Sequence, residues 1–236
     1  TQIPVLSSVA VVSQSQIQLL FNESMDSLSV TTAVFSLSNG LTVSSIQPVG
    51  PDFTVVNLFI SPLLDSITAY SITVSNATDC SGNTMTSTTK TFGIGVTPAK
   101  FEIVINEIFA DPAGSPGLPD AEFIEVYNTT SKVINLNGVI FSDASTSSII
   151  PDAVVFPNSY LILCDDADAN MYNNNFGRAV GLTSWPSLNN SGDSLSLRLP
   201  DGSLIHSVNY LDDWYADATK QAGGWTLEQI DSWNPC

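Results

Sequence analysis

The chain has 236 residues, and 43% of them are hydrophobic, so it can bury one large β core or two ordinary ones and is not a disordered polypeptide. Asp and Glu number 23 against 6 Lys and Arg, and this acidic balance argues against binding to nucleic acid or anionic lipid, which needs clustered cations. No apolar run approaches the roughly 20 residues of a membrane span. The opening residues, TQIPVLSS, lack the basic and apolar regions of a signal peptide. We therefore expect an extracellular protein without direct membrane insertion, whose signal peptide has been removed.

The first half of the chain has the pattern of an all-β sandwich. Short runs rich in Val, Ile, Thr and Phe recur about every 8–15 residues, with Gly, Pro, Asn, Asp and Ser between them. Seven short strands within about 100 residues are typical of an immunoglobulin-like domain. The predicted strands are Leu6–Val12, Gln16–Phe21, Val34–Leu37, Thr42–Val49, Phe53–Phe59, Ala69–Val74 and Thr89–Ile94.

The segment GIGVTPAK, residues 93–100, contains two glycines and a proline and is predicted to be an interdomain linker. After it the sequence predicts one helix, Asp166–Phe176, and a tight turn at Asp201-Gly202. The overall prediction is an all-β fold of two tandem immunoglobulin-like β-sandwiches, residues 1–97 and 101–236. The strands expected in the second half are Ile103–Phe109, Glu122–Asn128, Val133–Leu136, Val139–Phe141, Tyr160–Cys164, Ser194–Leu199, Leu204–Tyr210 and Trp225–Ile230.

Both halves resemble known families. The stretch LLFNESMDSLSVTTAVFSLSNGLTVSSI and the later SITVSNATDCSGNTM resemble a bacterial Ig-like domain of the SbsA type. The blocks VINEIFADP, EFIEVYNTTSKVINLNGVIFSD, PNSYLILC, WPSLNNSGDSLSLRLPDGSLIHSVNY and GGWTLEQID resemble a bacterial lamin tail domain. This second resemblance implies an immunoglobulin-like sandwich that occurs in multidomain secreted proteins, often beside Ig-like modules, nucleases or phosphatases. The pairing, with its DCSGN and NPC segments, resembles surface proteins of bacteria that use type IX secretion.

An acidic stretch, INEIFADPAGSPGLPDAEFIEVYN, offers a candidate metal site. Asp111, Asp120 and Glu122 could surround a Ca²⁺ together with loop carbonyls, because Ca²⁺ takes six to eight oxygen ligands. The alternative is a solvated acidic loop. Strict alternation in VINEIF would place Ile105, Glu107 and Phe109 on one face of a strand. In EFIEVYN the apolar residues do not alternate cleanly, which indicates a bulge or a strand buried on both faces. A glycosidase is disfavoured, because nothing indicates a sugar cleft between two carboxylates.

No catalytic residue is predicted, and we expect the chain not to be an enzyme. CDDADANMYNNN begins like an EF-hand loop but fails at its sixth and twelfth positions, Met171 and Gly177. Asp165 or Asp166 is instead expected to cap a short helix. His206 lacks a G-x-S-x-G partner motif and is predicted to be a structural or surface residue.

Aromatic residues gather in the last quarter of the chain. Trp185, Trp214 and Tyr215 lie in loop-like sequence and are candidate contacts for glycans or proteins. The alternative is that they close one end of the sandwich. Trp225 lies in an expected strand and is predicted to belong to the core.

Two covalent features, a disulfide and O-linked sugars, complete the predictions. The resemblance places Cys164 and Cys236 in one domain, where we expect a disulfide, with Cys80 free. Asp-Ser-Leu and Asp-Ser-Ile triplets resemble the O-glycosylation signal of the same bacteria, which makes Ser27, Ser66 and Ser194 candidate sugar sites.

The expected function is a non-catalytic structural or interaction module on the outer surface of a bacterium, as a spacer, an adhesive unit or a subunit of an assembly. Its partners would be other surface proteins, copies of itself or glycans. Two alternatives stay open: the accessory region of a larger secreted hydrolase, and a calcium- or glycan-binding module. No cofactor is expected apart from this candidate calcium.

Overall fold

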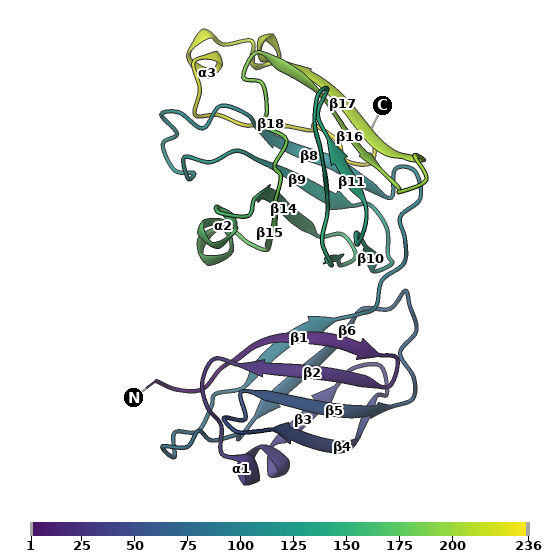
Figure 1. The fold of residues 1–236 in the computed structure, drawn as a ribbon, viewed down its shortest axis with the longest axis vertical. Coiled ribbons are helices and arrows are strands. Elements are labelled where there is room, and N and C mark those ends of the chain that lie inside the picture. Colours follow the sequence, from purple (N-terminus) through teal and green to yellow (C-terminus); the bar gives the residue numbers. More distant parts are fainter. Residues whose placement is uncertain (1, 235–236) are drawn as a thin grey trace. The chain divides into compact units, whose positions relative to one another are not determined.

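The computed structural model describes residues 2–234, and the chain divides into two compact units, Thr1–Ile94 and Gly95–Cys236. Strands are the main secondary structure of both units, and most of them pair antiparallel, so the predicted all-β class is confirmed (Figure 1). Within the described residues, no helix has the length and hydrophobicity needed to cross a membrane.

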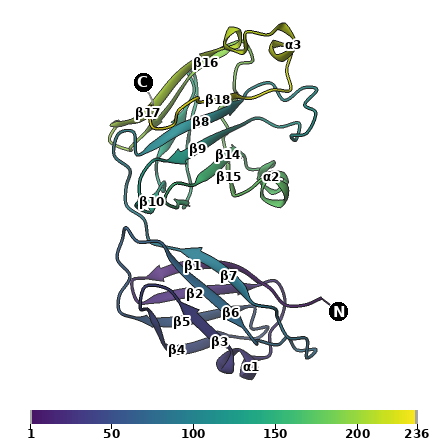
Figure 2. The same cartoon turned by 180° about the vertical axis from the view of Figure 1, so that it is seen from behind.

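The first unit is a sandwich of two sheets, with strand orders β1-β2-β5-β4 and β3-β6-β7 (Figure 2). Alternate residues of β2 and β5 point inward and form its core, as the period-2 pattern of a half-buried strand requires. A short helix, α1, was not expected from the sequence. It begins where the Asp26 carboxylate accepts a hydrogen bond from the Ser29 N–H at 2.6 Å. The elements are β1 (Leu6–Ser13), β2 (Gln16–Phe21), α1 (Ser27–Thr32), β3 (Val34–Leu37), β4 (Thr42–Val49), β5 (Val55–Ser61), β6 (Tyr70–Ser75) and β7 (Thr88–Phe92).

The second unit packs a five-stranded sheet, β15-β14-β9-β8-β18, and a four-stranded sheet, β12-β11-β16-β17, around a single large core, with a small β10-β13 pair beside them. Its elements are β8 (Ile103–Phe109), β9 (Phe123–Asn128), β10 (Ile134–Asn135), β11 (Ile140–Ser142), β12 (Ser147–Ile149), β13 (Val154–Val155), β14 (Tyr160–Asp165), α2 (Ala169–Asn175), β15 (Ala179–Leu182), β16 (Gly192–Arg198), β17 (Leu204–Leu211), a 3₁₀ helix η1 (Asp212–Tyr215), α3 (Ala218–Gln221) and β18 (Leu227–Glu228).

The five-stranded sheet is buried on both faces where α2 covers it. Ile124 and Val126 of β9 face the large core, whereas Phe123 faces a second cluster that contains Cys164 and Tyr172. Tyr172 anchors α2 there, because its hydroxyl donates a hydrogen bond to the Ala121 carbonyl at 2.6 Å. Of the two alternatives that the sequence left open for EFIEVYN, the structure shows a strand buried on both faces. The helix itself begins later than predicted, and its N-cap, Asp168, makes no side-chain capping bond.

A bulge in β8 changes the predicted alternation. The register between β8 and β9 shifts between Ile105 and Glu107, so Ile105 and Ile108 both enter the large core. Glu107 is thereby separated from Ile105, and the expectation that these two share a face is wrong. The Asp201-Gly202 turn between β16 and β17 forms as predicted, with Gly202 at a φ of 88°.

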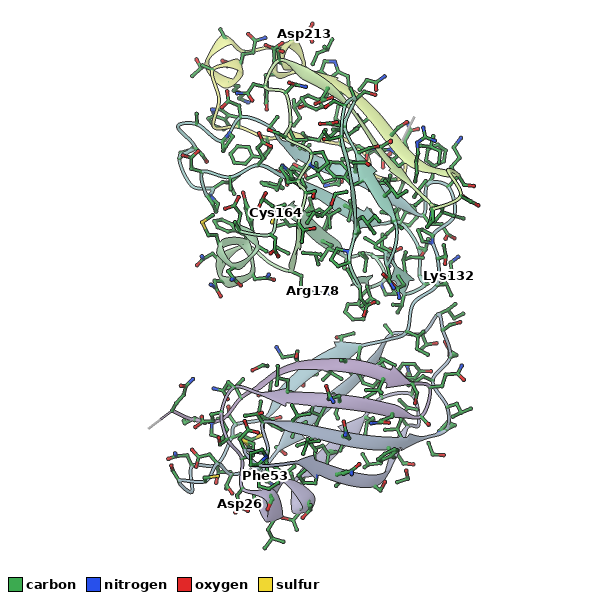
Figure 3. The ribbon with its side chains drawn as sticks, in the orientation of Figure 1. Asp26, Phe53, Lys132, Cys164, Arg178 and Asp213 are labelled. Carbon is green, nitrogen blue, oxygen red and sulfur yellow. The ribbon has the colours of Figure 1, made fainter. Side chains whose placement is uncertain are left out.

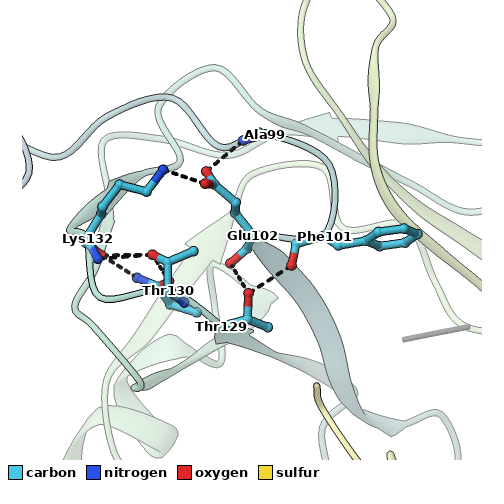
Figure 4. A network of polar contacts seen from close by, with 7 residues as sticks. Ala99, Phe101, Glu102, Thr129, Thr130 and Lys132 are labelled. Carbon is cyan, nitrogen blue, oxygen red and sulfur yellow. Dashed lines mark hydrogen bonds and ion pairs between the residues drawn. The ribbon is translucent and has the colours of Figure 1, made fainter. Parts of the chain in front are cut away.

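Polar contacts hold the segment that precedes β8 against the rest of the second unit (Figure 4). The Glu102 carboxylate accepts a hydrogen bond from the Ala99 N–H at 3.0 Å and forms an ion pair with Lys132. The Thr129 hydroxyl donates to the Phe101 carbonyl at 2.9 Å. Nearer the start of this segment, the Val96 N–H donates a hydrogen bond to the Val133 carbonyl at 3.0 Å, and the Val96 side chain packs on the large core. The later part of the predicted linker, from Val96 onward, is therefore packed and hydrogen-bonded within the second unit.

Candidate functional site

The second unit carries a surface pocket of about 610 Å³ next to a tryptophan. One wall is the turn that joins β11 to β12, and the other is the segment that follows β15. The pocket contains four hydroxyl side chains, one carboxylate and one aromatic ring. Its lining residues are Asp143, Ala144, Ser145, Thr146, Ser147, Ser184 and Trp185.

Asp143 organises the first wall. Its carboxylate accepts hydrogen bonds from the Ser145 N–H at 2.6 Å, the Ser145 hydroxyl at 3.1 Å and the Thr146 hydroxyl at 3.1 Å. Burial alone would raise the pKa of Asp143, but these hydrogen bonds and one from the Thr146 N–H outweigh it and hold the pKa below its usual value. The pocket therefore contains an ionised carboxylate at neutral pH.

Trp185 forms the second wall and is held at two points. Its ring packs against Phe141 with centroids 5.2 Å apart, and it belongs to the edge of the large core. Its indole N–H donates a hydrogen bond to the Glu122 carboxylate at 2.9 Å, and the same oxygen accepts from the Leu188 N–H at 2.9 Å. Glu122 thus fixes the orientation of the ring and of the loop after it.

A second acidic side chain, Asp193, joins the two walls. Its carboxylate accepts hydrogen bonds from the Ala144 N–H at 3.4 Å and from the Asn189 side-chain amide at 2.8 Å. Ala144 lies in the β11–β12 turn, and Asn189 lies in the loop before β16, so Asp193 connects the two pocket walls. Hydrogen bonds within the chain therefore connect the two walls of the pocket.

Family models divide the chain two residues after the boundary between the two structural units. Residues 1–96 match the model described as a bacterial Ig-like domain, and residues 97–212 match the Lamin Tail Domain. The family models thus show a bacterial Ig-like domain over residues 1–96, followed by a lamin tail domain over residues 97–212. The pocket lies in the lamin tail domain. No curated protein matches the sequence.

Solved structures give only distant likenesses. The N-terminal part of the bacterial S-layer protein SbsC is 12% identical over 89% of this chain and 44% of that chain, with a TM-score of 0.35. SbsC domains 1–6 give 9% identity, coverage of 89% and 41%, and a TM-score of 0.36. A DUF4876 family protein from Bacteroides thetaiotaomicron VPI-5482 gives 13% identity, coverage of 64% and 58%, and a TM-score of 0.30. The chain spans less than half the length of the S-layer structures.

The residues predicted to bind calcium do not assemble in the lamin tail domain. The Glu122 carboxylate accepts hydrogen bonds from the Trp185 indole N–H and the Leu188 N–H. The Asp111 carboxylate accepts one from the Ala113 N–H at 3.3 Å, and Asp120 is exposed. Among residues 2–234, no group of three His, Cys, Asp or Glu side chains is placed to hold a metal ion. Calcium binding gains no support from this geometry. The contact between Glu122 and Trp185 was not predicted, because the two residues are 63 positions apart.

The predicted aromatic contacts have different environments. Trp185 is half-buried in the pocket wall, whereas Trp214 in η1 is 55% exposed. The Tyr215 hydroxyl donates a hydrogen bond to the Trp225 carbonyl at 2.7 Å. Trp225 is 43% exposed, with the Lys220 ammonium 5.1 Å from its ring centroid, so its prediction as a core residue is wrong. Strand β18 covers only Leu227–Glu228, and Trp225 precedes it.

Three glutamates form a row across the five-stranded sheet, on the face opposite the large core. Glu125 of β9 lies opposite Glu107 of β8, which lies opposite Glu228 of β18. Burial raises the pKa of Glu125 to about 7, the charges of Glu107 and Glu228 add to the rise, and a hydrogen bond from Asn106 opposes it. Burial and Glu228 also raise the pKa of Glu107. The β8 bulge creates this row, so simple alternation could not predict it.

His206 has a structural position. It is buried on β17, and its Nδ1 accepts a hydrogen bond from the Ile105 N–H of β8 at 3.1 Å. The imidazole therefore satisfies a backbone donor of the other sheet, which agrees with the structural alternative expected from the sequence.

The cysteines differ in solvent access. Figure 3 labels Cys164 within the second unit. Cys164 is buried beneath α2, and burial, assisted by nearby aspartates, raises the pKa of its thiol to about 12, whereas Cys80 is exposed.

We expect iodoacetamide at about pH 8 to alkylate Cys80 in the folded protein and to reach Cys164 only after denaturation and reduction. Peptide mass spectrometry measures both, and alkylation of Cys164 in the folded protein would contradict the prediction. Because Cys236 lies outside the described residues, the same digest without reduction tests the predicted Cys164–Cys236 disulfide.

The candidate sugar-acceptor serines lie at or near the surface. Ser27 is half-buried at the start of α1, and Ser66 is exposed between β5 and β6. Ser194 is exposed on β16, where its hydroxyl donates a hydrogen bond to Asn209 at 2.6 Å. Modification of these serines stays a prediction.

Proposed function

We propose that the chain is a non-catalytic interaction module at the outer surface of a bacterium, where it acts as a spacer, an adhesive unit or a subunit of a surface assembly. The observation that carries this proposal is the succession of a bacterial Ig-like domain and a lamin tail domain over residues 1–212. Its partners would be other surface proteins or copies of the same chain, and the type IX pathway is the expected secretion route.

The positions of the chemically reactive side chains support a non-catalytic role. Glu122 holds Trp185, His206 holds the Ile105 N–H, and Cys164 is buried with a raised pKa. Each of these groups makes a contact that maintains the fold. A catalytic acid, base or nucleophile needs a partner and access to a reacting atom.

The proposal is tested on the protein in the cells that produce it. Intact cells are treated with a membrane-impermeant biotin reagent, and the labelled protein is extracted without denaturant and its native mass measured. We expect labelling on intact cells and a native mass above the 25.1 kDa of one chain. Protein that is labelled only after lysis would contradict a surface role. A heavier single polypeptide with hydrolase activity would instead support an accessory role in a larger secreted enzyme.

A further inference from the structure

We propose that the pocket between Asp143 and Trp185 in the lamin tail domain binds an uncharged saccharide, with the Trp185 ring as the platform for a sugar face. This inference rests on the proposed interaction function and names the chemistry of the ligand. The pocket, with a volume of about 610 Å³, is open to solvent, so it suits a ligand of one or two rings that stays partly hydrated, as a sugar can.

The polar lining matches sugar hydroxyls. Ser145, Thr146, Ser147 and Ser184 each bring a hydroxyl group, which can both donate and accept a hydrogen bond, as a sugar hydroxyl can. The hydroxyls of Ser145 and Thr146 donate to Asp143 and keep lone pairs for an incoming donor. A lipid tail would leave these groups without partners and would therefore be disfavoured.

The charge of the pocket selects against anions. The pKa of Asp143 is held below its usual value, so its carboxylate is ionised at neutral pH. No Lys or Arg lines the pocket, and the whole chain carries a formal net charge of −17. Phosphate, sulfate and acidic sugars would therefore be repelled, whereas an uncharged sugar could donate its hydroxyls to Asp143.

Contacts within the chain fix the orientation of the Trp185 ring. Trp185 packs against Phe141 on the core side and is tied through its indole N–H to Glu122. A tryptophan held in one orientation offers a large flat contact area at a small entropy cost on binding. Glu122 is thus a positioning residue, because it acts on the ligand through Trp185.

The test uses the full chain labelled with ¹⁵N. It is titrated with mannose, glucose, galactose and N-acetylglucosamine, with cellobiose and chitobiose, and with glucuronic acid and inorganic phosphate as anionic probes. We expect at least one uncharged sugar to shift the Trp185 indole resonance and the amide resonances of Ser145, Thr146 and Ser184, with a dissociation constant in the millimolar range or tighter. The anionic probes should shift none of them.

Two variants make the test specific. Ala144 is exposed and lines the pocket, so Ala144→Trp should fill the pocket without entering the core and weaken sugar binding at least about tenfold. Ala10 is exposed on β1 of the Ig-like domain, so Ala10→Trp is the matched control and should bind like the parent. Glu122→Ala removes the acceptor of the Trp185 indole N–H, so the indole resonance should move in the absence of sugar and sugar binding should weaken.

Three results would overturn the inference: no uncharged sugar shifts the pocket resonances, the shifts occur away from the pocket, or phosphate or glucuronic acid binds in preference. These failures are distinguishable from failure of the proposed function. Absence of sugar binding by a protein that is labelled on intact cells contradicts only the saccharide inference. Sugar binding by a protein confined to the cell interior contradicts only the surface role.

Discussion

Replacing Asn128 by alanine is expected to lower the free energy of unfolding of the lamin tail domain by about 3–5 kcal/mol. Asn128 is fully buried at the end of β9. The two hydrogens of its side-chain NH2 group serve three carbonyls, those of Lys132, Val155 and Phe156 at 2.8, 3.0 and 3.1 Å, so one hydrogen is shared between two of them. The side-chain oxygen accepts from the Thr130 N–H at 2.9 Å. Alanine would leave these backbone groups, which are buried or half-buried, without the partner that Asn128 provides.

Urea denaturation followed by tryptophan fluorescence measures this effect in one domain. All four tryptophans lie in the second half of the sequence, so the signal reports on the lamin tail domain. Asn128→Asp is the informative companion, because it keeps the volume but cannot donate hydrogen bonds and should destabilise at least as strongly. A loss below about 1 kcal/mol for Asn128→Ala would show that the network contributes little.

The second prediction concerns pH and the glutamate row. We expect the lamin tail domain to lose stability as the pH rises from about 4.5 to about 7, with Glu125 as a main contributor. The pKa of Glu125 is about 7 in the folded chain against an ordinary value of 4.5, so the folded state keeps a proton that the unfolded state has released. Each pKa unit corresponds to about 1.4 kcal/mol, and solvent screening of this half-buried group reduces the expected contribution to about 1–2 kcal/mol.

Glu125→Gln isolates this contribution. The substitution should raise the free energy of unfolding at about pH 8 by about 1–2 kcal/mol and change it little at about pH 5, where Glu125 is already protonated. Glutamine can still accept the hydrogen bond that Asn106 donates to Glu125. Asp152→Asn removes an equal charge from an exposed loop between β12 and β13 and should leave the pH dependence unchanged. Equal pH profiles for the parent and Glu125→Gln would contradict the prediction.

The sequence predicted strands best where β-branched runs end at turn residues. Strands β2, β3, β4 and β8 have the same bounds in the structure as in the prediction. Three features with no such signal were missed. Helix α1 contains Ser, Val and Thr, which are weak helix formers, and it depends on the Asp26 cap and on burial of Val30. Strand β15 joins the sheet through parallel pairing with β14. The β8 bulge depends on its pairing with β9.

The site was predicted only in part, because its contacts join distant segments. Trp185 and Glu122 were each selected from the sequence, the first for an aromatic contact and the second for calcium. The structure joins them to each other, and this contact depends on how β9 and the loop after β15 meet. The hydroxyl wall formed by residues 143–147 had no sequence signal, because serine-rich turns are common in loops. Burial decided the role of His206, and burial is a property of the assembled sheets.

The backbone hydrogen bonds of Val96 determine where a truncated form of the lamin tail domain can begin. Gly95 has a φ of 80°, and any Cβ there would lie 2.8 Å from the Asn135 nitrogen, so the chain can pass β10 closely only as glycine. The next residue, Val96, exchanges backbone hydrogen bonds with Val133 and Asn135. The family match begins one residue later, at 97. A truncated fragment that starts at the family boundary would discard this pairing and expose the backbone edge of β10, so a fragment intended for isolated study needs to begin no later than residue 95.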